Sequence, residues 1–373
     1  MKRTLALIAA ALTLPSAFAG VLPEPRADVM RHVYDGGGME IDGWSILGRA
    51  SLGKSVSVSG NYYTDSVSSA SIDVLTQASP YSEERTEYSV GMDYLRNDTI
   101  MSVAVTKSDE SDYEAKTLNL GVSQEVFGGL TTVSLGYGRG SDVVGERGTD
   151  RADDADHWRY RVGVSQVLTR NIIMSLNYEA AADEGFLNNP YRQVRYVDPD
   201  SATGYSFQAE VYPRTRDSNA VAVHAKYYLP WRAAASAGYR FFNDSWGIEA
   251  STVDLGYVHP VKDWTFEAGY RYYTQTAADF YSDLFPFANA QNFLARDKEL
   301  STFTSHTVRA GASYEWPMDT WIFKKGSANA FIDHVMFSYD DFRNIDRTDA
   351  DVGAEPTYEF DANIYQFFFS FWF

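Results

Sequence analysis

Apolar and polar side chains alternate along this chain in segments of about ten residues, separated by breaks. Residues 87–94 are typical, and one face of this segment carries Tyr88, Val90, Met92 and Tyr94. Glu87 and Asp93 project from the opposite face. The same pattern returns in 118–123, 158–165, 221–229, 266–272 and 308–316. Because successive side chains of a β-strand point to opposite faces, the sequence predicts an almost entirely β structure.

The polar face of these segments is rich in charge and glycine, which favours a transmembrane antiparallel β-barrel. A closed barrel pairs every backbone group around its ring, so one face can meet lipid and the other water. The 26 Tyr, 22 Phe and 8 Trp in a chain of mean hydropathy −0.32 fit this class, because aromatic residues gather at both membrane interfaces. A soluble antiparallel sandwich also alternates and is the alternative. The recurrence of large aromatics near strand ends favours the barrel.

The first 19 residues have the features of a secretory signal peptide. Lys2 and Arg3 precede a short apolar run, and Ala17-Phe18-Ala19 forms a small-x-small cleavage site. We therefore expect a signal peptide over 1–19 and one barrel domain over 20–373. The mature chain would have 373 − 19 = 354 residues, and losing two basic residues takes the net charge from −18 to −20. A retained anchor helix is the alternative, although the apolar run is short for a membrane span.

The connections between segments alternate in length. Short breaks occur near 53–54, 97–99, 127–129, 169–171, 230–231 and 260–263. Longer polar connections occupy 66–85, 107–114, 141–155, 183–216, 276–302 and 341–358. Outer-membrane barrels have short periplasmic turns and long extracellular loops, so the pattern assigns each strand a direction.

Counting with this alternation predicts sixteen strands, with fourteen or eighteen as rivals. The count needs a first strand over 28–34, followed by a turn at Gly36-Gly37-Gly38. Segments 194–197 and 205–212 are expected to form a hairpin inside the longest outer loop; extension of the wall is the alternative.

The last strand places aromatic side chains on one face at Tyr365, Phe367, Phe369, Phe371 and Phe373. A terminal aromatic residue with aromatics at alternate positions before it is the type of signal that the outer-membrane assembly machinery recognises. In a soluble protein such a run would promote aggregation. We therefore expect the assembly machinery as a partner and the outer membrane as the location.

Several sequence blocks resemble an uncharacterised bacterial family, the domain of unknown function DUF3570. These blocks are 26–30, 35–38, 69–74, 78–85, 112–116 and 130–137. The resemblance implies an outer-membrane barrel whose genes tend to lie beside genes for periplasmic redox proteins or flavinylation. It transfers no catalytic residue and names no partner.

The charged residues on the polar face of the strands are predicted to line the lumen. They are Arg49, Glu87, Asp93, Glu125, Arg159, Arg161, His224, Lys226, Arg240, Asp254, Glu267, Arg271, Arg309 and Glu315. One interpretation sets the basic residues between 159 and 309 on one arc, opposite the acidic residues between 87 and 125, so that they select ions. The alternative is that neighbouring strands pair these charges and plug the barrel, for example between the strands of Glu267/Arg271 and Arg309/Glu315.

The outer connections are acidic, particularly within 142–156 and 340–359. Clustered carboxylates suit Ca²⁺ or Mg²⁺, which could bridge to lipopolysaccharide phosphates. The favoured interpretation is a solvated, mutually repelling surface, and no metal site is predicted. The less acidic segment 67–85 is expected to fold inward as a constriction, with a surface patch as the alternative.

Enzymatic activity is not predicted, because the six histidines are scattered and no nucleophile motif is present. Only two pairings at the barrel rim merit testing: His157 with Asp154 or Asp156, and His306 with Ser305. The absence of cysteine excludes disulfides, thiolate metal sites and covalent c-type haem, and no cofactor is expected. The acidic balance disfavours nucleic-acid binding. The sequence therefore predicts a porin-like channel with lipid and lipopolysaccharide around it, or alternatively a plugged barrel that docks a periplasmic redox partner.

Overall fold

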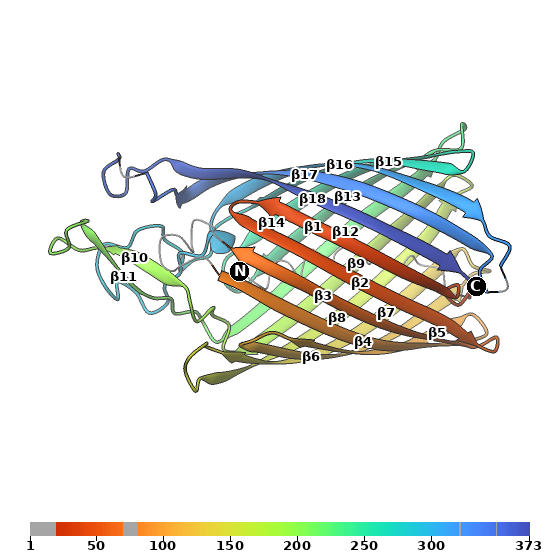
Figure 1. The fold of residues 1–373 in the computed structure, drawn as a ribbon, viewed down its shortest axis with the longest axis horizontal. Helices are drawn as coiled ribbons and strands as arrows, with labels where there is room; N and C mark the ends of the chain where they lie inside the picture. Colours follow the sequence, from red (N-terminus) through yellow and green to blue (C-terminus); the bar gives the residue numbers. More distant parts are fainter. Residues whose placement is uncertain (1–19, 70–80, 321, 348) are drawn as a thin grey trace.

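The protein is a closed antiparallel β-barrel, seen here in a computed structural model that describes residues 20–69, 81–320, 322–347 and 349–373 (Figure 1). The predicted signal peptide over 1–19 lies outside the described residues. The first half of the wall consists of β1 (Arg26–Gly36), β2 (Met39–Leu52), β3 (Val56–Ser69), β4 (Tyr81–Arg96), β5 (Thr99–Asp109), β6 (Tyr113–Val126), β7 (Thr131–Gly145), β8 (Ala152–Thr169) and β9 (Ile172–Gly185). The second half consists of β12 (Thr215–Tyr228), β13 (Ala234–Asp244), β14 (Glu249–Val261), β15 (Trp264–Gln275), β16 (Phe303–Pro317), β17 (Lys325–Arg343) and β18 (Thr357–Trp372).

The predicted count of sixteen wall strands is confirmed. The expected first strand exists as β1, and it closes the ring by pairing with both β2 and β18. Gly37 and Gly38, with φ of 60° and 74°, form the two-residue turn between β1 and β2. Both turn positions need positive φ, which glycine adopts without a Cβ clash.

The two ends of the barrel differ, as Figure 1 shows. At one end, which we call the short-turn end, tight turns join the strands; at the other, the long-loop end, the connections are extended. The expected hairpin lies in the loop between β9 and β12 as β10 (Gln193–Val197) and β11 (Tyr205–Ala209), outside the wall. The next large loop holds a single helical turn, η1 (Lys298–Leu300).

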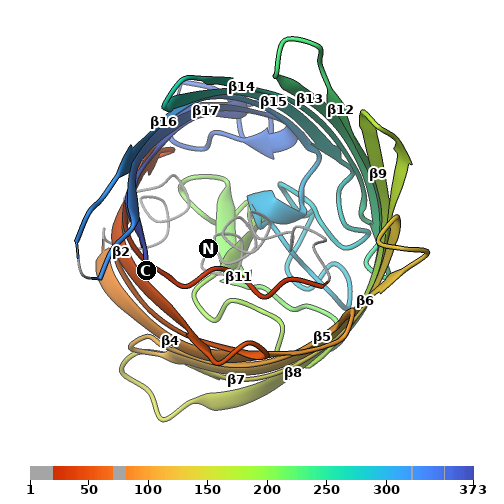
Figure 2. The same cartoon turned by 90° about the vertical axis from the view of Figure 1, so that its right-hand side faces the viewer.

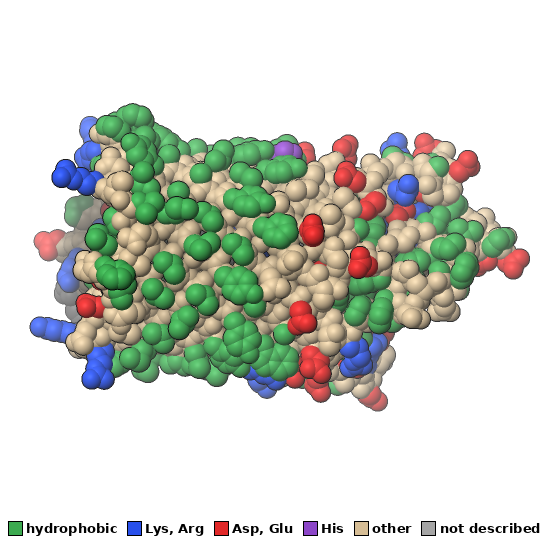
Figure 3. Space-filling model, turned by 180° about the vertical axis from the view of Figure 1, so that it is seen from behind, with side chains coloured by type: hydrophobic (Ala, Val, Ile, Leu, Met, Phe, Trp, Pro, Cys, Tyr) green, Lys and Arg blue, Asp and Glu red, His purple; other side chains and the backbone are tan. Residues whose placement is uncertain are grey.

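The outer face of the wall is an apolar belt (Figure 3). Leu120 on β6, Val90 on β4 and Ile46 on β2 are 45%, 68% and 53% exposed, which a soluble protein would rarely repeat around its whole surface. Phe367 and Phe369 continue the belt on β18, half exposed, as the alternation at the C-terminus predicts. No helix among the described residues is long and apolar enough to cross a membrane. The predicted fold class, a transmembrane antiparallel barrel, is confirmed.

Segment 67–85 was expected to fold inward. Its described ends instead continue the wall, since Val67 pairs with Glu83 and Asp65 pairs with Arg85 in the ladder between β3 and β4. A β-ladder holds these residues because their backbone groups find partners there. Residues 70–80, where a constriction was predicted, lie outside the described part of the chain.

Candidate functional site: the lumen and its loop cap

All fourteen predicted lumen residues lie on the face of the wall opposite the apolar belt. Their positions along each strand show this, because side chains alternate between the two faces; Arg309, for example, lies between Val308 and Ala310. The remaining inner positions at mid-height are often small, as at Gly121 on β6 and Gly256 on β14. A bulky apolar filling of the kind that packs narrow barrels is therefore missing from these positions.

Several ion pairs join strands along this inner face; of the five described here, four link adjacent strands, and Arg49–Asp93 reaches from β2 across β3 to β4. Their N–O distances are Arg49–Asp93 2.7 Å, Arg161–Glu179 2.6 Å, Arg271–Asp254 2.6 Å, Arg309–Asp333 2.6 Å and Lys325–Glu315 3.4 Å. Most members are only partly buried, so each pair contributes little to stability. The pairs matter more for the lumen field, because a neutralised charge attracts ions weakly.

The predicted pairing between the strands of Glu267/Arg271 and Arg309/Glu315 is wrong in its partners. Arg271 turns to Asp254 on β14, and Arg309 turns to Asp333 on β17, although β15 and β16 are adjacent as expected. The reason is register: Asp254 and Asp333 are directly opposite these arginines across the ladder, whereas Glu267 and Glu315 are not. Alternation identifies the face of a residue, but its neighbour across the ladder depends on the register.

Three of the predicted basic residues keep their charge uncompensated. Arg159 on β8, Lys226 on β12 and Arg240 on β13 form no ion pair within the described part of the chain. These strands lie on one arc of the ring, where β8, β9, β12 and β13 are consecutive neighbours. The expected basic arc therefore survives in reduced form, on three residues rather than six.

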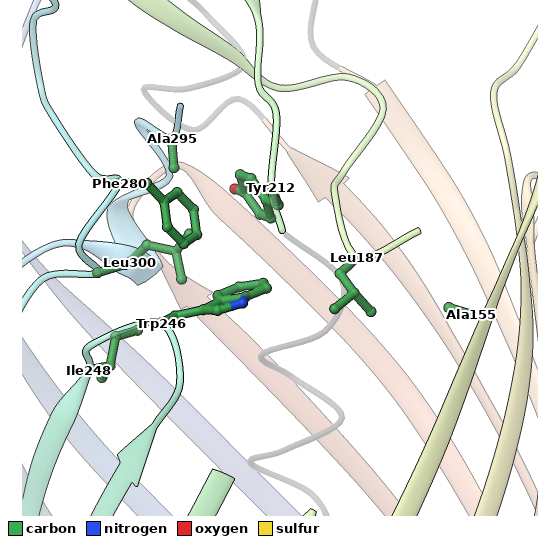
Figure 4. Close-up of a cluster of buried hydrophobic side chains, with 9 residues drawn as sticks. Ala155, Leu187, Tyr212, Trp246, Ile248, Phe280, Ala295 and Leu300 are labelled. Carbon is green, nitrogen blue, oxygen red and sulfur yellow. The ribbon is translucent and has the colours of Figure 1, made fainter. Parts of the chain in front are cut away.

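Loops at the long-loop end fold together into a compact cap, which the sequence did not predict. The cap comprises the loops 186–214 and 276–302, the turn 245–248 and the connection between β17 and β18. Figure 2, a view into the short-turn end, shows β11 and the loops around η1 within the outline of the ring. An aromatic cluster holds part of the cap: Trp246 meets Phe280 and Tyr212 edge to face, with ring centroids 5.2 and 5.5 Å apart (Figure 4).

The centre of the cap is Asp283, whose carboxylate is bound by three arginines. Arg195 lies 3.0 Å away, Arg296 2.9 Å and Arg343 3.5 Å. Arg195 is completely buried and also binds Glu355 at 2.5 Å. These residues come from both large loops, from the end of β17 and from the β17–β18 connection. Buried charges persist only when they are well paired, so this network fixes how the segments pack.

The cap also contacts strands of the wall. Arg216 of β12 lies 4.5 Å from the ring centroid of Trp246 and is bound to Asp244 at the end of β13. Further along the ring, Arg296 stacks on Phe342 of β17 at 4.5 Å and donates to the carbonyl oxygen of Arg343. Contacts at these two places on the wall hold the cap at the mouth of the lumen.

Glu210 is a buried acid within the cap. Its carboxylate is buried, accepts hydrogen bonds from Tyr212 Oη (2.6 Å) and the Arg296 backbone N–H (2.7 Å), and lies near Asp297 and Arg192. Burial, together with the charge of Asp297, raises the pKa of Glu210 from its ordinary 4.5 to about 7. The raised pKa means that the folded cap favours the protonated acid.

We therefore expect the cap to weaken as the pH rises from about 4.5 through about 7, because ionised Glu210 must then be held in the cap at a cost. Limited proteolysis of loop 186–214 at about pH 5 and about pH 8 measures this, with faster cleavage at the higher pH beyond the protease's own pH dependence. Glu210→Gln should remove most of the difference. Equal pH dependence in both proteins would contradict the assignment.

Neither predicted rim pairing of a histidine exists. His157 points to the inner face and bonds Asp142 at 2.9 Å and Asp183 at 2.5 Å, rather than Asp154 or Asp156. His306 and Ser305 are consecutive in β16, so their side chains point to opposite faces of the wall. His306 instead accepts or donates at Tyr270 Oη, 2.8 Å away.

The acidic outer loops contain basic side chains that pair with some of their carboxylates. Arg151 binds Asp153 at 2.6 Å and Glu146 at 3.5 Å, while Asp142 and Glu355 are buried in the contacts described above. Carboxylate oxygens of Glu83, near the start of β4, and of Glu110 and Asp112, in the β5–β6 connection, lie within 4.8 Å of one another. The sequence had not singled out this trio, because its members come from two separate connections.

Three solved structures with some likeness to the barrel are distant from it in sequence. A bacterial polysaccharide outer membrane secretin matches 95% of this chain and 99% of its own at 6% identity and a TM-score of 0.47. A loop L8 deletion mutant of OmpT, an outer membrane protein of Vibrio cholerae, matches 93% and 98% at 8% identity and 0.41. The siderophore receptor PirA of Acinetobacter baumannii matches 91% of this chain and 57% of its own at 11% identity and 0.44. These likenesses are too weak to transfer a function.

No curated protein matches the sequence. The pattern of one family does match, over residues 39–154 and 144–321, which together cover most of the barrel wall. That family is the one expected from the sequence blocks between 26 and 137. The chain belongs to the family described as protein of unknown function DUF3570.

Proposed function

We propose that this protein lies in the outer membrane of a Gram-negative bacterium and lets small hydrophilic solutes or ions cross it. The closed wall and its apolar belt support insertion into a bilayer, since a closed ring leaves no strand edge unpaired. The expected signal peptide supports export. Short turns would face the periplasm and the cap would face the outside, as in other barrels of this type.

The observation that carries the proposal is the inner face of a sixteen-stranded wall. A wall of eight strands is just wide enough for side chains to fill its interior, whereas walls of sixteen strands leave an aqueous channel. At mid-height the inner face presents glycines and charged groups rather than large apolar ones. Solvated charges on such a face are the means by which pores discriminate between ions.

The uncompensated cations give a direct test of conduction. Changing both Lys226 and Arg240 to glutamate should shift ion selectivity severalfold towards cations, because the lumen field changes sign on that arc. The measurement is the reversal potential of purified protein in planar bilayers under a KCl gradient. The matched control is Lys116→Glu, whose side chain is 64% exposed on the outer face and should leave selectivity unchanged.

A barrel closed to solutes, which docks a periplasmic redox or flavinylation-linked partner, is the second candidate. It is favoured by the cap and by the five ion pairs described on the inner wall. Bilayers that stay silent with correctly folded protein would support this candidate and overturn the channel. Discrete conductance steps with the selectivity shift above would support the channel.

A further inference from the structure

Residues 20–25 form a strap across the short-turn end of the barrel. Figure 2 shows this segment in red, running from the start of β1 across the opening towards β6. It belongs to no strand. One end of the strap is fixed beside the end of the wall, where the Phe373 backbone N–H donates to the Pro25 carbonyl oxygen at 3.3 Å.

The sequence of the strap makes it stiff. Pro23 and Pro25 lie at alternate positions, and proline restricts both its own φ and the residue before it to extended conformations. In a polyproline-like conformation each residue adds about 3.1 Å, so six residues extend roughly 19 Å. A segment of this kind can reach across the opening instead of folding back on itself.

The far end of the strap lies against the carboxylate of Glu125 at the end of β6. A Cβ built on Gly20 would be 3.0 Å from Oε2 and 3.3 Å from Oε1 of Glu125, so the carboxylate closely approaches the main chain of Gly20. The backbone N–H of Glu125 already has a hydrogen-bond partner, because it donates to the Asp98 carbonyl oxygen at 2.9 Å. Within the described residues, no arginine, lysine or histidine pairs with the Glu125 carboxylate.

We propose that Glu125 is a binding site for an ammonium group, the amino terminus of the processed chain. Hydrolysis of the Ala19–Gly20 peptide bond consumes one water, leaves a carboxyl group on Ala19 and creates an α-amino group on Gly20. That group takes up a proton at neutral pH and becomes a cation next to the Glu125 carboxylate. Cleavage thereby supplies the counter-charge that Glu125 lacks.

With this ion pair the strap would be held at both ends. The covalent chain holds one end at β1, and the ion pair with Glu125 holds the other at the end of β6. β1 and β6 are separated by four wall strands, so the strap divides the opening rather than following its rim. Under the channel function proposed above, on which only this consequence rests, the strap narrows the periplasmic exit. The ammonium site itself does not depend on that function.

The test begins with the amino terminus of protein purified from outer membranes. Mass spectrometry should find Gly20 first, in a tryptic peptide covering residues 20–26. Competitive acetylation of the folded protein across a pH series then gives the α-amino pKa from the same peptide. We expect a pKa about half a unit to one unit above the ordinary value of roughly 7.7–8.0, because the carboxylate favours the charged form.

Glu125→Gln should return the α-amino pKa to its value in urea, whereas Asp98→Asn, which removes an acid at a neighbouring turn, should leave it raised. A different amino terminus, or the same α-amino pKa in wild type and Glu125→Gln, overturns the proposal. Both variants are first shown to be folded by heat-dependent gel mobility. A raised α-amino pKa in a protein that gives no conductance would support the ammonium site and reject the channel. Conductance from a protein whose α-amino pKa is not raised would support the channel and reject the ammonium site.

Discussion

Replacing Asp283 with alanine is expected to release the cap while leaving the barrel intact. Three arginines lose their shared carboxylate, and Arg195 and Arg296 are almost fully buried. Removing one partner of a buried ion pair typically costs about 3–5 kcal/mol, because the remaining charge is left desolvated. The equilibrium between closed and open cap should therefore shift by more than about a hundredfold.

Limited proteolysis and bilayer recording would detect this change. In the Asp283→Ala protein, loops 186–214 and 276–302 should be cut rapidly, and conductance should rise or fluctuate if the cap obstructs the mouth. Asp349→Ala is the matched control. Asp349 and Arg347 form an ion pair with an N–O distance of 3.7 Å, but both side chains are largely exposed, so the pair contributes little to stability. Protease resistance equal to wild type would show that Asp283 does not hold the cap.

An arginine on the apolar belt should strongly destabilise the barrel in a bilayer. Leu120 lies at the middle of β6 and is 45% exposed on the outer face. Arginine at the bilayer midplane costs roughly 2–4 kcal/mol on the lipid face of such barrels, which corresponds to about 30- to 1,000-fold in the folding equilibrium. Reversible urea unfolding of Leu120→Arg in lipid vesicles would measure this loss.

The neighbouring residue supplies the control for this experiment. Asn119 precedes Leu120 in the same strand and points to the inner face, so Asn119→Arg adds the same charge at the same depth. Asn119→Arg should change the free energy of unfolding by less than about 1 kcal/mol if the inner face is in contact with water. Equal destabilisation by the two arginines would mean that the two faces do not meet lipid and water respectively.

The difference between these two positions could be predicted from the sequence, but the cap could not. The placement of Leu120 and Asn119 follows from a period of two, which any strand imposes on its side chains. Arg195 and Glu355 are 160 positions apart, one in the hairpin strand β10 and the other in the β17–β18 connection, and they share no period. Their adjacency depends on where the ring brings β9, β15 and β17, which no local pattern encodes.

The ion pairs of the wall were partly predictable. Alternation identified Arg271 and Arg309 as inner-face residues, but their partners Asp254 and Asp333 are set by register between strands. Glu179, the partner of Arg161, could have been found by extending the alternation through Leu176 and Tyr178. The acidic segment 340–359 suggested mutual repulsion, whereas Glu355 within it is buried and paired with Arg195.

The sequence alone therefore determined the closed barrel, its sixteen strands and the face of each wall residue. Those properties follow from short-range rules, namely side-chain alternation and the lengths of the breaks between segments. Only the tertiary structure decided which inner charges remain uncompensated, that two large loops close over one mouth and that a strap crosses the other. These features arise from contacts between distant segments, and such contacts exist only once the ring has closed.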